Sequence, residues 1–88
     1  MDTANALKKE FLSLSFNREG FCTNRKALNA FRMKCARLAE KSMAYSPNSF
    51  DSPIVYLFID GSVLKLSNPR QASTGAHVST SPEWALLF

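Results

Sequence analysis

The stretch that decides the fold is IVYLFIDGSVLKLS, residues 54–67. Two runs rich in β-branched and aromatic residues flank Asp60-Gly61, and such a dipeptide between apolar runs is a strong signal for a β-hairpin. We therefore expect strands over about 54–59 and 62–67, joined by a two-residue loop. Two strands alone are only marginally stable in water, so this hairpin needs cover from the rest of the chain or from a partner.

A two-residue loop would fix which side chains share a face of the hairpin, because strand residues alternate between the two faces. The expected pairs on the face that packs on the helices are Ile59 with Ser62, Leu57 with Leu64, and Val55 with Leu66. The expected pairs on the outer face are Phe58 with Val63, and Tyr56 with Lys65. This outer face is mixed in character, and it is covered either by the C-terminal WALLF segment or by a partner. In the second case, Tyr56, Phe58 and Lys65 are the predicted protein-binding residues.

Upstream of the hairpin, two segments show the three- and four-residue apolar spacing of amphipathic helices. The first runs from about residue 3 to residue 16, with Asp2 or Thr3 as its N-cap. The second runs from about residue 24 to residue 44, with Thr23 as its N-cap, and would span about 30 Å. The apolar stripes are Ala4, Leu7, Phe11 and Leu14 in the first helix, and Leu28, Phe31, Cys35 and Leu38 in the second.

Downstream of the hairpin, residues 68–82 are polar and rich in Ser, Thr and Gly, which is typical of a loop that can be mobile. Within this loop, AHVST can add a short third strand near residues 76–80. The end, SPEWALLF, has the cap and the early proline of a short C-terminal helical turn. The whole pattern predicts one small α+β domain over residues 1–88, with two helices packed on the hairpin.

Composition limits the class of protein. The chain has 88 residues, a net charge of +4 and a pI near 9.4, which is mildly basic and favours an acidic partner. No apolar run approaches the roughly 18 residues that a membrane span needs, and the N-terminus lacks the apolar core of a secretory signal. Two cysteines are too few for a disulfide-stapled scaffold. We therefore expect a cytoplasmic protein with free thiols.

Side chains suited to catalysis or metal binding are sparse. His77 is the single histidine and lies in the polar loop, and no motif marks a nucleophile near it. Cys22 and Cys35 have neither a CxxC nor an HxxxH companion. The three glycines are scattered, so no phosphate-binding loop exists. The sequence therefore predicts no enzyme activity, no metal site and no cofactor.

One arc of the second helix gathers basic residues, namely Lys26, Lys34, Arg37 and Lys41. Such a face can orient an acidic protein partner, or it can contact the phosphates of a nucleic acid. Our leading prediction is a small non-enzymatic binding module that acts by protein–protein interaction, as an adaptor, regulator or inhibitor, alone or as a homodimer. The alternative is a nucleic-acid-binding protein that uses the basic face of the second helix.

Overall fold

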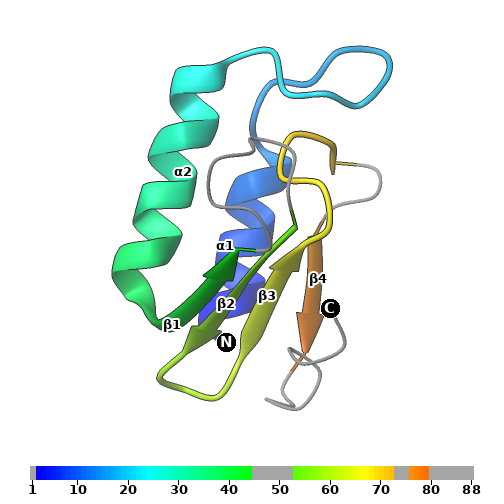
Figure 1. The fold of residues 1–88 in the computed structure, drawn as a ribbon. Helices are drawn as coiled ribbons and strands as arrows, with labels where there is room; N and C mark the ends of the chain where they lie inside the picture. The colour runs from blue at the N-terminus through cyan, green and yellow to red at the C-terminus, as the bar shows by residue number, and fades with distance from the viewer. Residues whose placement is uncertain (1, 45–52, 73–75, 80–88) are drawn as a thin grey trace.

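The computed structural model describes residues 2–44, 53–72 and 76–79. In this part of the chain, two helices precede an antiparallel sheet in which the strands follow one another in chain order, so the α+β prediction is confirmed. Both helices pack on the same face of the sheet (Figure 1), where α1 contacts β3 and β4 and α2 contacts β1 and β2. The elements are α1 (Thr3–Leu12), α2 (Arg25–Leu38), β1 (Ala39–Ala44), β2 (Ile54–Phe58), β3 (Val63–Leu66) and β4 (Ala76–Ser79).

Helix α1 begins where the sequence predicted but ends earlier. The Asp2 side chain accepts a hydrogen bond from the backbone N–H of Asn5 and caps the helix. The helix stops at Leu12 instead of continuing to about residue 16, because Phe16 leaves it to form an isolated antiparallel bridge with Cys22. The tighter path still packs Phe16 against the core, where its ring lies edge-on to that of Phe11 at 5.6 Å between centroids.

The predicted second helix is wrong over residues 39–44, which form strand β1. Asn24, rather than Thr23, caps α2, and Ala39 at its C-terminal end has extended backbone angles, φ −77° and ψ 138°. The sequence AEKSMA contains no helix breaker, so its local propensity favours a longer helix. Antiparallel pairing with β2 overrides that propensity, because a strand there satisfies backbone groups along an otherwise open edge of β2.

The hairpin is present, but its register differs by one residue from the prediction. Phe58 donates its N–H to the Ser62 carbonyl at 2.9 Å, and Gly61 donates to the Phe58 carbonyl at 3.0 Å, so the loop has three residues. A two-residue type I′ turn needs positive φ at both Asp60 and Gly61, and only Gly61 has it, at 86°. Because strand side chains alternate, the shift exchanges the two faces of β2 alone: Tyr56 lies opposite Leu64 on the helix side, and the side chains of β3 keep their predicted faces.

The hairpin tip also caps the first helix. The Asp60 carboxylate accepts hydrogen bonds from the backbone N–H and the Oγ1 of Thr3, both at 2.8 Å. It accepts two more from the backbone N–H and the Oγ of Ser62, at 3.0 and 2.6 Å. The Ser62 Oγ in turn accepts from the N–H of Ala4. The turn therefore provides the otherwise unsatisfied donors of the first turn of α1 with acceptors.

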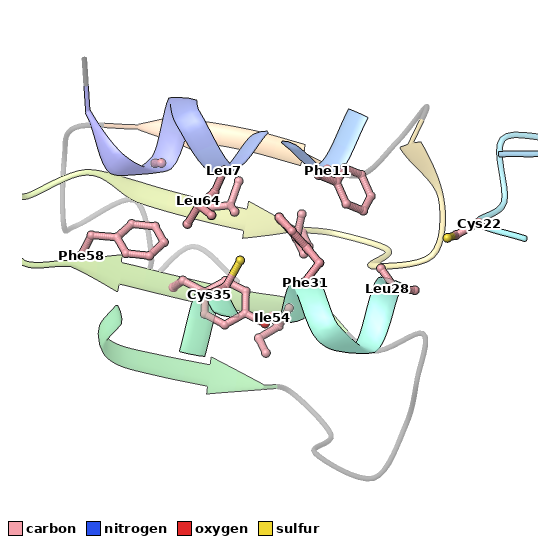
Figure 2. Close-up of a cluster of buried hydrophobic side chains, with 12 residues drawn as sticks. Leu7, Phe11, Cys22, Leu28, Phe31, Cys35, Ile54, Phe58 and Leu64 are labelled. Atoms are coloured by element: carbon pink, nitrogen blue, oxygen red, sulfur yellow. The ribbon is translucent and has the colours of Figure 1, made fainter. Parts of the chain in front are cut away.

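The core lies between the helices and the sheet. Figure 2 shows side chains from both helices and from the strands converging there, including Leu7 and Phe11 of α1 and Phe31 of α2. Its buried members are Ala4, Leu7, Phe11, Cys22, Leu28, Phe31, Cys35, Ile54, Tyr56, Phe58, Leu64 and Leu66. Full burial of one large apolar side chain is worth about 1.5–3 kcal/mol, so this cluster dominates the stability of the domain.

The remaining predictions fall on the end of the chain and on the polar loop. The third strand is confirmed as β4, which pairs antiparallel with β3. Residues 70–72 of the polar loop are joined to residues 20–22 by backbone hydrogen bonds, from the Cys22 N–H to the Arg70 carbonyl at 2.7 Å and from the Ala72 N–H to the Gly20 carbonyl at 2.9 Å. The predicted C-terminal helical turn and the WALLF segment lie outside the described residues.

Candidate interaction surface

Tyr56 and Phe58, two of the three predicted protein-binding residues, belong to the core. Each side chain is only 1% exposed, and the two rings lie 6.4 Å apart beneath the helices. Burial raises the pKa of Tyr56 to about 12, and its hydroxyl donates to the Arg32 carbonyl at 3.5 Å. The prediction that these aromatics form an outer face was therefore wrong, since the one-residue register shift points them inward.

Lys65 does lie on the sheet face away from the helices. It is half-buried and sits opposite Val55 on one neighbouring strand and His77 on the other. The buried apolar side chains of this face are Val55 and Val63, with Leu57 packed against them. Lys65 thus accompanies an aliphatic cluster instead of the aromatic pair that the sequence predicted.

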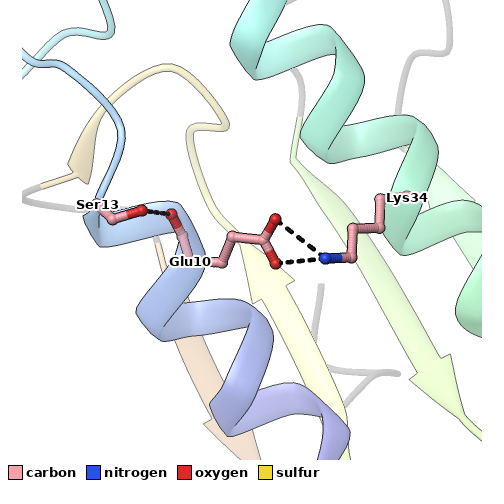
Figure 3. Close-up of polar contacts among 3 residues, drawn as sticks. All are labelled: Glu10, Ser13 and Lys34. Carbon is pink, nitrogen blue, oxygen red and sulfur yellow. Dashed lines mark hydrogen bonds and ion pairs between the residues drawn. The ribbon is translucent and has the colours of Figure 1, made fainter.

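The four predicted basic residues do not share one helix face. Lys41 belongs to β1, where it is exposed and lies opposite Leu57. Lys34 is on α2 but reaches toward α1, where its Nζ contacts both carboxylate oxygens of Glu10, at 2.8 and 3.1 Å. Figure 3 shows this ion pair bridging the two helices. Only Lys26 and Arg37 remain together on the exposed side of α2.

The ion pair between Lys34 and Glu10 is a link between helices. Both side chains are more than 40% exposed, so water screens their attraction, and such a pair contributes about 0.2–1 kcal/mol. Its main consequence for the surface is electrostatic: it offsets the positive charge of Lys34 locally. The cations on α2 that face solvent without a partner in the described part of the chain are Lys26 and Arg37.

The exposed side of α2 carries an ordered row of side chains, which we call the α2 stripe: Lys26, Ala30, Met33 and Arg37. The spacing of four, three and four residues places them on one line, opposite the buried Leu28, Phe31 and Cys35. Met33 is 61% exposed, more than any other large apolar side chain of the two described helices. An apolar centre with a cation at each end is therefore presented to solvent.

Positive charge is strongly concentrated in the two helices. The helices α1 and α2 hold seven of the eleven basic residues and one of the seven acidic residues, which gives them a net charge of +6. The rest of the chain holds four basic and six acidic residues, a net charge of −2. Helix α2 alone has five basic residues and no acidic one. The helical layer is therefore a positively charged surface on a domain that is otherwise slightly acidic.

The described residues offer little for catalysis or metal binding. Burial, followed by the nearby Glu10 carboxylate, raises the pKa of the Cys35 thiol to about 12, so this thiol stays protonated and unreactive at neutral pH. Cys22 is also buried, and its Sγ donates to the Asn24 carbonyl at 3.4 Å. Within the described residues, no group of three His, Cys, Asp or Glu side chains could hold a metal ion.

Sequence reasoning missed two features of this surface. Met33 was not singled out, although a helical wheel of about 100° per residue places it directly opposite the buried stripe. Lys8 and Lys9 of α1 also belong to the positively charged layer, but the sequence alone did not show that both helices cover the same face of the sheet. The first feature could have been found from periodicity, whereas the second required the tertiary arrangement.

Comparisons with known proteins return no family model, no curated protein and no solved structure that matches this chain. Neither of the two described helices combines the length and the apolar character that crossing a membrane requires.

Proposed function

We propose that this chain is a small non-enzymatic binding module that contacts a partner protein through the exposed face of α2. The observation that carries the proposal is the position of Met33, which is 61% exposed between the cations Lys26 and Arg37. Protein interfaces characteristically combine an apolar centre with a polar rim, and Met and Arg are enriched in them. A module of this kind suits an adaptor, a regulator or an inhibitor.

The charge of the surface supports an acidic partner. Helix α2 contains no acidic residue, so a partner with carboxylates is attracted over the whole length of the helix. Complementary charge raises the rate of encounter and sets the orientation, while desolvation of Met33 contributes affinity. We further propose that the module works in the cytoplasm, because its two cysteines are buried thiols that form no disulfide.

Nucleic-acid binding is the second candidate, and the net charge of +6 on the helical layer favours it. Phosphate backbones are attracted to such layers without any requirement for an apolar contact. Met33 gives phosphates nothing to bind, which is why we place this function second.

Affinity capture with matched variants tests the proposal. The tagged wild-type protein and the double variant Lys26→Glu/Arg37→Glu are used to capture proteins from lysate of the native host, with and without nuclease. We expect a defined set of proteins that survives nuclease with the wild type and is depleted roughly tenfold with the double variant, because each substitution replaces attraction by repulsion. Arg18→Glu is the control, since Arg18 is an exposed cation in the turn after α1.

Two results would contradict the proposal. Equal recovery with the wild type and the double variant would show that α2 is not the binding surface. Recovery that collapses on nuclease treatment would show that nucleic acid bridges the captured proteins, and the second candidate would then replace the first. Circular dichroism of each variant confirms that the fold is intact.

A further inference from the structure

We infer that the α2 stripe docks an acidic amphipathic helix of a different protein. This inference rests on the proposed function and specifies the partner. Three features of the stripe support it: the spacing of its residues, its positive charge, and the repulsion between like charges that would arise if two copies of it packed together.

The geometry of the stripe matches that of a helix–helix seam. Steps of four, three and four residues from Lys26 to Arg37 are the spacing at which one helix packs along another with a small crossing angle. The row is about 16 Å long at 1.5 Å per residue, which corresponds to three turns of a partner helix. Ala30 has a short side chain, so a partner backbone can come close there, and the neighbouring Met33 can insert between partner side chains.

The charges of the stripe require that the partner be acidic. Lys26 and Arg37 stand at its two ends, and α2 has no carboxylate of its own to offset them. A partner helix with an apolar seam flanked by Glu or Asp would pair with both ends while covering Met33. Charged pairs at the ends of such a seam determine which partner is accepted and in which orientation.

A second copy of this chain is a poor occupant of the stripe. Antiparallel packing of two stripes about a twofold axis would set Lys26 of one copy against Arg37 of the other, at both ends of the seam. Parallel packing would set each cation against its own counterpart. Like charges oppose association in either arrangement, so the stripe selects a different protein over a homodimer.

A titration with synthetic peptides, followed by NMR of the isotope-labelled full chain, tests the inference. The main probe is a peptide of about three heptads, with Leu at the a and d positions and Glu at the flanking positions. Two further peptides serve as comparisons: one has the same sequence but two central prolines that prevent a helix, and the other has Lys in place of Glu. A short DNA duplex is the fourth probe.

We expect the acidic helical peptide to shift the amide signals of α2 and to bind roughly tenfold more tightly than either comparison peptide. Met33→Ala should weaken binding about fivefold, and Lys26→Glu/Arg37→Glu should weaken it roughly tenfold. Arg18→Glu removes an exposed cation away from the stripe and should leave the affinity unchanged.

The possible failures can be told apart. Equal binding of the acidic helical peptide and its proline-containing version would overturn the helical partner but leave an acidic protein partner standing. Binding of the DNA duplex with no binding of the acidic peptide would overturn both the inference and the proposed function. Peptide binding that shifts signals elsewhere and leaves those of α2 in place would remove the stripe as the docking surface.

Discussion

The Asp60 carboxylate illustrates how much one residue can organise in this small domain. Hydrogen bonds from Ser62 and Thr3 hold the pKa of this carboxyl well below its usual range. Because the ionised form is the one that the fold stabilises, the contribution of Asp60 is complete above the unfolded-state pKa, which is about 3.9. It is lost as the pH falls below that value, since the unfolded chain takes up the proton first.

This pH dependence of the contribution of Asp60 gives a prediction for the variant Asp60→Asn. At pH 7 the wild type should have the higher thermal unfolding midpoint, because the amide cannot accept all the hydrogen bonds that the carboxylate accepts. The difference between the two proteins should shrink as the pH is lowered from about 4 toward 2, because the Asp60 carboxyl of the unfolded wild-type chain becomes protonated there while that of the folded chain stays ionised. A difference in midpoint that stays constant over this range of pH would show that the charge of Asp60 is not what stabilises the turn.

At the scale of secondary-structure elements, the sequence predicts which segments form helices or strands better than it predicts how the strands pair. Apolar periodicity predicts the two helix starts, the Asp60-Gly61 dipeptide between apolar runs predicts the hairpin, and the AHVST segment predicts the short strand β4. It cannot predict the three-residue loop, because that choice depends on Asp60 and Ser62 contacting Thr3 and Ala4, more than fifty residues away. For the same reason it misses strand β1, whose conformation is decided by pairing with β2.

The register has a direct mutational test in two neighbouring hydrophobic residues. Phe58 is 1% exposed and Ile59 is 87% exposed, whereas the two-residue loop would have buried Ile59 against the helices. Phe58→Ala should lower the free energy of unfolding by about 3–5 kcal/mol through lost burial and a cavity. Ile59→Ala should change it by no more than about 0.5 kcal/mol. Urea denaturation of both variants measures these free energies of unfolding. A larger loss for Ile59→Ala than for Phe58→Ala would contradict the three-residue loop and support the two-residue loop.

At the scale of the whole molecule, the dominant feature is the separation of charge between the helical layer and the rest. The sequence already contains the concentration of basic residues on α2, and Lys26 and Arg37 stay exposed on that helix. The sequence does not reveal that Lys34 is engaged with Glu10, or that α1 adds its own cations to the same layer. Both facts depend on how the two helices lie relative to each other.

The segregated charge should make the stability of the domain depend on salt. Cations of the helical layer repel one another, and salt screens exposed charges over about 10 Å at 0.1 M ionic strength. Raising the salt concentration from about 0.01 to 0.2 M should therefore raise the thermal midpoint by roughly 2–4 °C. The increase should be smaller for Arg37→Glu, which reduces the net charge of the layer. A midpoint that falls with salt would mean that attractive pairs, such as the one between Lys34 and Glu10, outweigh the repulsion.

The contact between the hairpin tip and α1 also bears on the order of events during protein synthesis. Thr3 and its acceptor Asp60 are 57 positions apart, so the ribosome makes the helix long before it makes the turn that caps it. A ten-residue helix is marginal by itself in water. The segment that forms α1 should therefore lack stable helical structure until the hairpin has emerged from the exit tunnel. The domain should then fold late and in one step.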